Sequence, residues 1–129
     1  MMILKKSGKP VAILQCVSHY PIKPKDANLR VMKTFEKVFD CIVGYSDHSM
    51  GITVPVAAVA LGAKIIEKHF TLDKTRSTFH DHQLSADPDD FQEMVTRIRA
   101  VETMISDGPS LEPTVYKTDV LTSGMVLSW

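Results

Sequence analysis

The chain has 129 residues, enough for one ordinary domain. Hydrophobic residues make up 44% of it and charged residues 23%, a globular balance that argues against a disordered chain. Fifteen basic and fifteen acidic residues cancel, so the composition offers no broad charged surface for nucleic acid or for a membrane of anionic lipid.

Three features bear on the compartment. The longest apolar run, residues 54–63, is too short to cross a bilayer. Near the start of the chain the lysines follow the apolar residues, which is the reverse of a secretory signal. Cys16 and Cys41 lie at or near predicted buried strands, and two thiols make no disulfide framework. We therefore expect a cytoplasmic protein with reduced core cysteines, a disulfide between neighbouring strands being the alternative.

Strand and helix patterns alternate in the first half of the chain. A near-continuous apolar run at residues 11–17 predicts a strand buried on both faces. Two prolines make residues 21–25 an irregular loop, and apolar residues then recur at helical spacing over residues 29–39. Residues 41–45 predict a second strand, and residues 51–61 a small, apolar, deeply packed helix.

The second half continues the alternation. Residues 64–70 predict a third strand, and residues 71–86 a long polar loop. Asp87 is the expected N-cap of a helix that carries an apolar stripe up to Ile105. Residues 110–129 show no clear period, so we expect residues 1–109 to form the domain and the rest to be a tail, a linker or a partial strand.

Repeated strand–helix units predict an α/β fold, because parallel strands need helical crossovers. The carboxyl ends of such strands carry the reactive residues. All the histidines lie at these ends or in the loop beyond one: His19, His48, His69, His80 and His82. This clustering predicts a functional site at that edge of the sheet.

Strand alternation selects the side chains that share a face. Ser46 and His48 share one on the second strand, and His69 lies on the matching face of the third. Ser18 and Tyr20 share a face beyond the first strand. If these faces are the inner ones, the side chains converge on one pocket.

Two neutral imidazoles on neighbouring strands suit a divalent metal and leave positions open for substrate oxygens. Asp47 and Glu67 are candidates to orient the rings of His48 and His69. The alternative is that each histidine is a hydrogen-bonded structural residue. Because the two histidines occupy matching positions, the metal-site and structural interpretations carry equal weight. A metal-dependent hydrolase using the same pair lacks a third ligand at a suitable spacing.

Three motifs carry a resemblance to a known family. They are Leu-Gln-Cys-Val-Ser-His-Tyr-Pro at residues 14–21, Gly-Tyr-Ser-Asp-His at 44–48 and Ile-Glu-Lys-His-Phe-Thr-Leu-Asp at 66–73. Together with Asp81-His82, Ser85 and Asp87-Pro88 they resemble the sialic acid synthase family. The family includes N-acetylneuraminate, legionaminate and pseudaminate synthases and a spore-coat polysaccharide protein.

The resemblance implies a partial (β/α)8 TIM barrel, consisting of the last three βα units with parallel strands. It also implies a transferase that condenses phosphoenolpyruvate with an N-acetylated aldose, such as N-acetylmannosamine, into a nine-carbon 2-keto-3-deoxy acid. His48 and His69 would be the catalytic, metal-binding residues. The metal would be Mn²⁺, with Mg²⁺ or Co²⁺ as alternatives. The substrate-binding residues would be Ser18, Tyr20, Ser46 and Asp81.

A complete barrel takes about 250 residues. The resemblance places a catalytic glutamate and the phosphate-gripping lysines on strands that this chain does not match. We therefore expect a fragment with little or no activity alone, completed by an N-terminal half, within a family whose full-length members are homodimers. The alternative function is a non-catalytic half-barrel assembly module.

Overall fold

The computed structural model describes residues 8–75, 80–105 and 124–126 of the chain. In chain order, the elements are β1 (Ala12–Cys16), η1 (Pro24–Asp26), α2 (Val31–Val38), β2 (Ile42–Asp47), α3 (Thr53–Ala60), β3 (Ile65–Lys68), α4 (His80–Leu84), α5 (Pro88–Ile105) and β4 (Gly124–Val126).

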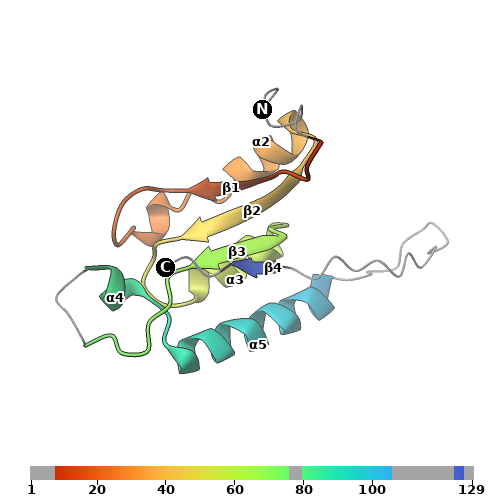
Figure 1. Ribbon diagram of the computed structural model, residues 1–129. Helices are drawn as coiled ribbons and strands as arrows, with labels where there is room; N and C mark the ends of the chain where they lie inside the picture. The colour runs from red at the N-terminus through yellow and green to blue at the C-terminus, as the bar shows by residue number, and fades with distance from the viewer. Residues whose placement is uncertain (1–7, 76–79, 106–123, 127–129) are drawn as a thin grey trace.

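The strands form one parallel sheet in the order β1-β2-β3-β4, which is also their order along the chain (Figure 1). This arrangement confirms the predicted α/β class with parallel pairing. The register sets Cys16 opposite Ser46 and, one strand further, Ser46 opposite Glu67. The carboxyl ends of the first three strands therefore lie at one edge of the sheet.

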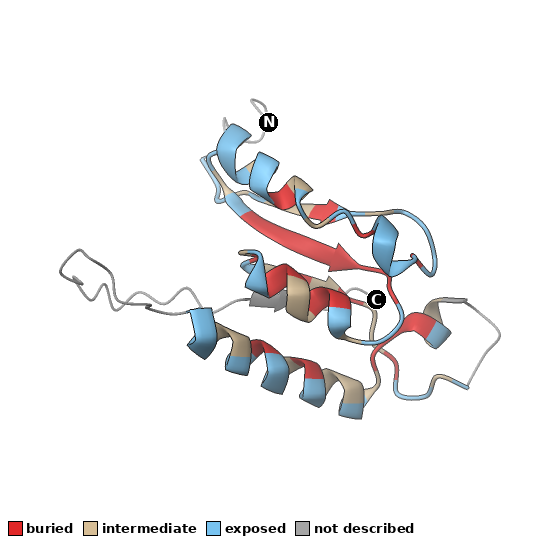
Figure 2. Ribbon diagram, turned by 180° about the vertical axis from the view of Figure 1, so that it is seen from behind, coloured by how far each residue is buried: buried red, intermediate tan, exposed pale blue. Residues whose placement is uncertain are grey.

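Helices α2, α3 and α5 cover the same face of the sheet (Figures 1 and 2). Helix α2 contacts β1 and β2, α3 contacts β2, and α5 packs against α3. The core between these layers includes Met32, Tyr45, Ala58, Ile66 and Met94, each of them 2% exposed or less. Every residue of strand β2 except Ile42 is buried, because the strand has a neighbour on each side and helices over one face.

The predicted N-terminus of the long last helix agrees with the structure. Asp87 accepts a hydrogen bond from the Asp90 amide at 2.9 Å, the capping interaction expected from its position. Burial follows the predicted stripe in the middle of the helix, at Met94 and Ile98, whereas Met104 and Ile105 are exposed near its end.

Two expectations about burial are wrong. Strand β1 lies at the edge of the described sheet, so of its residues only Gln15 is buried, and the strand is not covered on both faces. Cys16 and Cys41 are free thiols, as expected, but Cys16 is exposed and Cys41 only partly buried. Neither is a core residue, since one is on the edge strand and the other precedes β2.

The sequence patterns missed two short elements. Helix η1 lies in the proline-containing loop, and α4 lies in the segment expected to be a polar loop. Strand β4 lies in the segment for which a tail, a linker or a partial strand was expected, and it pairs in parallel with β3. Pairing there satisfies backbone N–H and C=O groups that β3 would otherwise leave open. The expected boundary between residues 109 and 110 lies outside the described residues.

Within the described part of the chain, no helix is both long enough and apolar enough to span a membrane.

Candidate functional site

Strands β2 and β3 deliver their last side chains to the two faces of the sheet in matched pairs. Ser46 and Glu67 face each other on the side away from the helices, and the Ser46 hydroxyl donates a 2.7 Å hydrogen bond to Glu67 Oε1. The next pair in the register, Asp47 and Lys68, points to the opposite face. One residue further along each strand, His48 and His69 return to the first face.

The two histidine rings lie against each other and against a tyrosine. The centroids of the His48 and His69 rings are 5.3 Å apart. The ring of Tyr20 is tilted over His48 at a centroid distance of 4.1 Å and meets His69 edge-on at 5.8 Å. Residues from three consecutive strand ends therefore form one aromatic cluster, of which Tyr20 is 41% exposed and His48 5% exposed.

A backbone carbonyl fixes the tautomer of His48. Its Nδ1 lies 3.0 Å from the carbonyl oxygen of Val17. Because that oxygen can only accept, Nδ1 carries a proton and donates it in this hydrogen bond. The Val17 carbonyl also accepts the His19 amide at 2.8 Å, and the His48 carbonyl accepts the Ile22 amide at 3.0 Å. The segment after β1 thus holds the ring and its backbone together.

The surroundings of His69 favour its neutral form. Burial, and next the charge of His48, lower the pKa of His69 from its ordinary value of 6.5, while Asp81 and Glu67 act in the opposite direction. The pKa of Tyr20 is raised, first by burial and then by the negative charges of Cys16, Asp81 and Glu67. The Tyr20 hydroxyl is therefore protonated at neutral pH and able to donate.

The structure brings together five of the six side chains singled out from the sequence. His48, His69 and Tyr20 are in ring contact, Ser46 lies on the same face and binds Glu67, and the charge of Asp81 acts on the pKa of Tyr20 and of His69. Ser18 is exposed, and its hydroxyl makes no hydrogen bond to any other described residue. Strand β1 ends at Cys16 and the chain turns at Val17, so the alternation used to align Ser18 no longer applies there.

The hypothesis that Asp47 orients a histidine ring is wrong. Strand alternation sends its carboxylate to the helix side of the sheet, where it binds Lys68 Nζ at 2.7 Å and the Ser49 amide and hydroxyl at 3.1 and 3.0 Å. Asp47 directly precedes His48, and neighbouring residues of a strand face opposite sides of the sheet. The sequence itself therefore argued against a contact between Asp47 and the His48 ring. Lys68 was not singled out from the sequence. Glu67 binds Ser46, and its role in orienting a ring stays a prediction.

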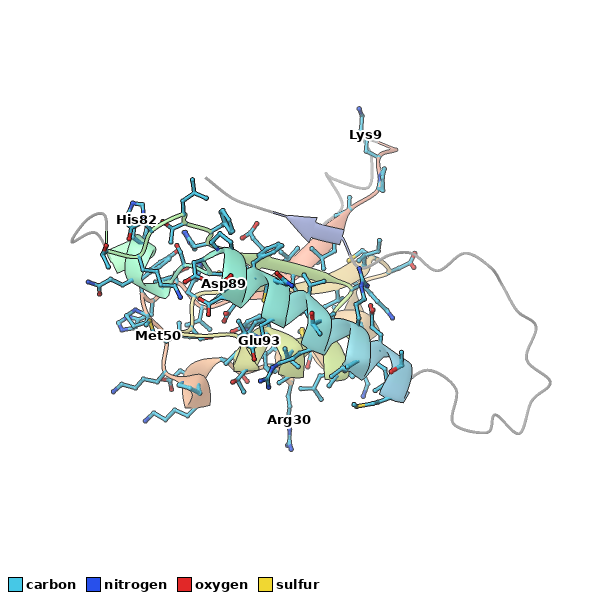
Figure 3. The ribbon with its side chains drawn as sticks, turned by 90° about the horizontal axis from the view of Figure 1, so that it is seen from below. Lys9, Arg30, Met50, His82, Asp89 and Glu93 are labelled. Atoms are coloured by element: carbon cyan, nitrogen blue, oxygen red, sulfur yellow. The ribbon has the colours of Figure 1, made fainter. Side chains whose placement is uncertain are left out.

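The segment after β3 folds back over the same end of the molecule. His80-Asp81-His82, expected to be solvated loop, opens helix α4, and His82 Nδ1 lies 3.0 Å from the Thr71 hydroxyl. Lys74 bridges to Asp87, at 3.0 Å, and to Asp90 at the start of α5. Figure 3 shows His82 and Met50 at the end toward which the strands run, and Lys9 at the other end.

The pair of histidines fits a divalent metal in its donor chemistry. The hydrogen bond at Nδ1 of His48 leaves Nε2 as the ring atom that could reach a metal, and the neutral state favoured at His69 suits the same role. The carbonyl acceptor on Nδ1 is the usual outer support of a metal-binding histidine. Among residues 8–75, 80–105 and 124–126, no set of three or more His, Cys, Asp or Glu side chains could hold an ion together. This part of the chain would therefore supply two ligands.

Comparison with known proteins identifies a match over most of the chain. The model of the NeuB family matches residues 1–110. The N-acetylneuraminate-9-phosphate synthase of Mus musculus is 48% identical over 101 residues, covering 78% of this chain and 28% of that protein. The pseudaminic acid synthase of Campylobacter jejuni (serotype O:2) is 40% identical over 128 residues, covering 98% of this chain and 37% of that enzyme.

The fold has a counterpart among solved structures. The crystal structure of the N-acetylneuraminic acid (sialic acid) synthetase from Leptospira borgpetersenii superposes with a TM-score of 0.80 at 40% sequence identity. The match covers 91% of this chain and 40% of that one. The chain thus spans about a third of the length of the curated relatives it matches.

Proposed function

Because the chain belongs to the NeuB family, we propose that it carries part of the active site of a synthase that makes sialic-type acids. The resemblance noted from the three sequence motifs is confirmed at the level of the family. The reaction we propose is the condensation of phosphoenolpyruvate with an N-acetylated aldose to give a nine-carbon 2-keto-3-deoxy acid and phosphate. The observation that carries the proposal is the contact between the rings of His48 and His69 at the carboxyl ends of neighbouring strands.

We propose that His48 and His69 hold the divalent metal of this site, Mn²⁺ or otherwise Mg²⁺ or Co²⁺. A bound ion would supply Lewis acidity to the aldehyde oxygen of the sugar. The residues of this chain would hold the two imidazole rings in the orientation that the ion requires. The Val17 carbonyl does this for His48 by accepting a hydrogen bond from Nδ1, and burial favours the neutral ring of His69.

Substrate binding falls to the polar groups around the two rings. Tyr20, protonated at neutral pH, would donate to a substrate oxygen above His48. Asp81, close enough to influence Tyr20 and His69, would accept hydrogen bonds from sugar hydroxyls. Ser46 reaches the site already bonded to Glu67, so it would bind substrate through its remaining acceptor capacity. We also propose a substrate contact for Ser18, which is exposed.

We propose that the sheet is part of a (β/α)8 barrel. Parallel strands in chain order with helices on one face support this arrangement. About two thirds of the length of the relatives lies outside the match, and the full reaction would need groups from that unmatched portion. A complementing N-terminal half, or a second subunit in a homodimer, would supply them.

The first test is Mn²⁺ binding by calorimetry to the unaltered chain, His48→Ala and His69→Ala. We expect the unaltered chain to bind and each variant to lose at least about tenfold in affinity, since each removes one of two imidazole ligands. His19→Ala is the matched control, because His19 is an exposed histidine at the end of β1 that makes no ring contact with the described part of the site. Absence of Mn²⁺ binding in the unaltered chain, or equal binding by all four proteins, would contradict the metal site.

A further inference from the structure

The helix side of the sheet carries a buried ion pair directly behind the two histidines. Lys68 Nζ and Asp47 Oδ2 are 2.7 Å apart, and their side chains are 2% and 0% exposed. They are register partners on β3 and β2. Each immediately precedes one of the histidines, so the ion pair joins the two strands at the last point before His48 and His69.

The same network also holds the chain after His48. Lys68 donates a second hydrogen bond, of 2.8 Å, to the Ser49 carbonyl, while Asp47 accepts from the Ser49 amide and hydroxyl. The backbone on both sides of His48 is thereby tied to β3. Ser49 is fully buried and is bridged to Ile22, next to the Tyr20 segment.

On the site face, the contacts between the ends of β2 and β3 are weaker than those on the helix face. Ser46 and Glu67 share one hydrogen bond, and the three aromatic rings touch without a hydrogen bond between them. The ring of His48 is set by the Val17 carbonyl, which lies on the β1 side and leaves the distance to β3 undetermined. The pairing of β2 with β3 ends at Asp47 and Lys68, so the side chains of this last pair are the final link between the two strands before His48 and His69.

We propose that Asp47 and Lys68 are positioning residues whose ion pair, with Ser49, sets the separation of His48 and His69. A buried ion pair is a costly way to stabilise a fold, and an apolar pair of similar volume serves that purpose at least as well. What the pair adds is a defined distance and direction between two strand ends. The two residues act through the backbone and touch neither ring.

The test replaces both charges while keeping the side-chain volumes, in Asp47→Asn combined with Lys68→Met. Removing both partners together avoids a lone buried charge, so we expect this double variant to fold. Glu93→Gln with Arg97→Met is the matched control, an ion pair on the exposed face of α5 with side chains 53% and 62% exposed. Circular dichroism and thermal unfolding confirm that each variant is folded before comparison.

Two readouts are made on the full chain. Without metal, nuclear Overhauser contacts between the rings of His48, His69 and Tyr20 report their packing directly. With Co²⁺, the absorption spectrum and the dissociation constant report the geometry of the pair. We expect the double variant to lose the His48–His69 contacts and to bind Co²⁺ about 10- to 100-fold more weakly, the usual range for residues that support metal ligands. The control variant should match the unaltered chain in both.

The two readouts separate this inference from the function proposed above. The Co²⁺ measurement rests on the proposed metal site, whereas the ring contacts exist without metal. If the unaltered chain binds no Co²⁺, the metal site fails and the ring contacts alone decide the positioning role. Unchanged ring contacts in a folded double variant overturn the positioning role, even if Co²⁺ binds. If the double variant does not fold, Ser49→Ala takes its place, because it removes only the hydroxyl bond to Asp47. We expect Ser49→Ala to weaken the same ring contacts. Unchanged ring contacts in Ser49→Ala would also overturn the positioning role.

Discussion

At the scale of single residues, the two faces of one strand pair carry different chemistry. On the site face, Ser46 and His48 are polar groups with partners on neighbouring strands. On the helix face, Tyr45 is fully buried and its hydroxyl has no hydrogen-bond partner among the described residues. Burial raises the pKa of Tyr45, so this phenol stays protonated. Asp47 and Lys68 complete that face as the buried ion pair.

Breaking the ion pair from one side should be far more damaging than removing it whole. Lys68→Met leaves the Asp47 carboxylate buried without its cation, and we expect a loss of about 3–5 kcal/mol in the free energy of unfolding. Arg97→Met is the comparison, because its ion pair with Glu93 is more than half exposed and should be worth less than about 1 kcal/mol. Urea denaturation measures both. A similar small loss in the two variants would show that the Asp47 site is hydrated.

At the scale of the element, strands β2 and β3 approach each other closely at Gly44. A Cβ added there would lie 2.6 Å from the Ile65 carbonyl oxygen and 2.8 Å from the Ile65 Cβ. Real Cβ atoms essentially never come so close, so the two strands would have to separate. Glycine at this position therefore permits the pairing that places Ser46 beside Glu67 two residues later.

Gly44→Ala should destabilise the chain by about 1–3 kcal/mol, the usual cost of forcing a methyl group into a packed site. It should also weaken the Ser46–Glu67 hydrogen bond, because the strands shift just before it. Chemical denaturation gives the free energy, and the chemical shifts of β2 and β3 amides give the local change. Ala12→Val is the control, a larger side chain at an exposed position of edge strand β1. Equal stability of the two variants would mean that β2 and β3 can separate at position 44 without a loss of stability.

The strands and helices with strong patterns could be predicted, and the short elements could not. The apolar runs of β1 to β3 and the stripe of α5 are long enough to reveal their period. Helices η1 and α4 have three and five residues, less than two turns, so no helical period can develop in them. The pairing of β4 with β3 depends on contacts far apart in the sequence, which local pattern does not contain.

At the scale of the whole molecule, the edge at which the site forms could be predicted because parallel strands bring their carboxyl ends together. The sequence pattern was enough to align His48 with His69. It could not assign the tautomer of His48, which depends on the turn at Val17, or the partner of Asp47, which depends on the register with Lys68. Both are three-dimensional contacts between residues more than twenty positions apart.

The stability of the whole chain should fall as a metal-free solution is acidified. His69 has a lowered pKa in the folded chain, so below about pH 6.5 the unfolded chain binds more protons and stability rises with pH. With a chelator present, we expect the free energy of unfolding to drop between about pH 7.5 and pH 5.5. The contribution of this residue is the part of that slope that disappears in His69→Gln. Identical slopes for the two proteins would contradict the lowered pKa.

The acceptor that fixes the His48 ring is a main-chain oxygen, and this has a consequence for how the site can vary. Any amino acid at position 17 would still offer that carbonyl, so no substitution of Val17 removes the acceptor itself. Only a change in the path of the backbone at the end of β1 could remove this hydrogen bond. The Nδ1 hydrogen bond of this imidazole is therefore inherited with the fold rather than with any one side chain, and it can persist while the residues around it diverge.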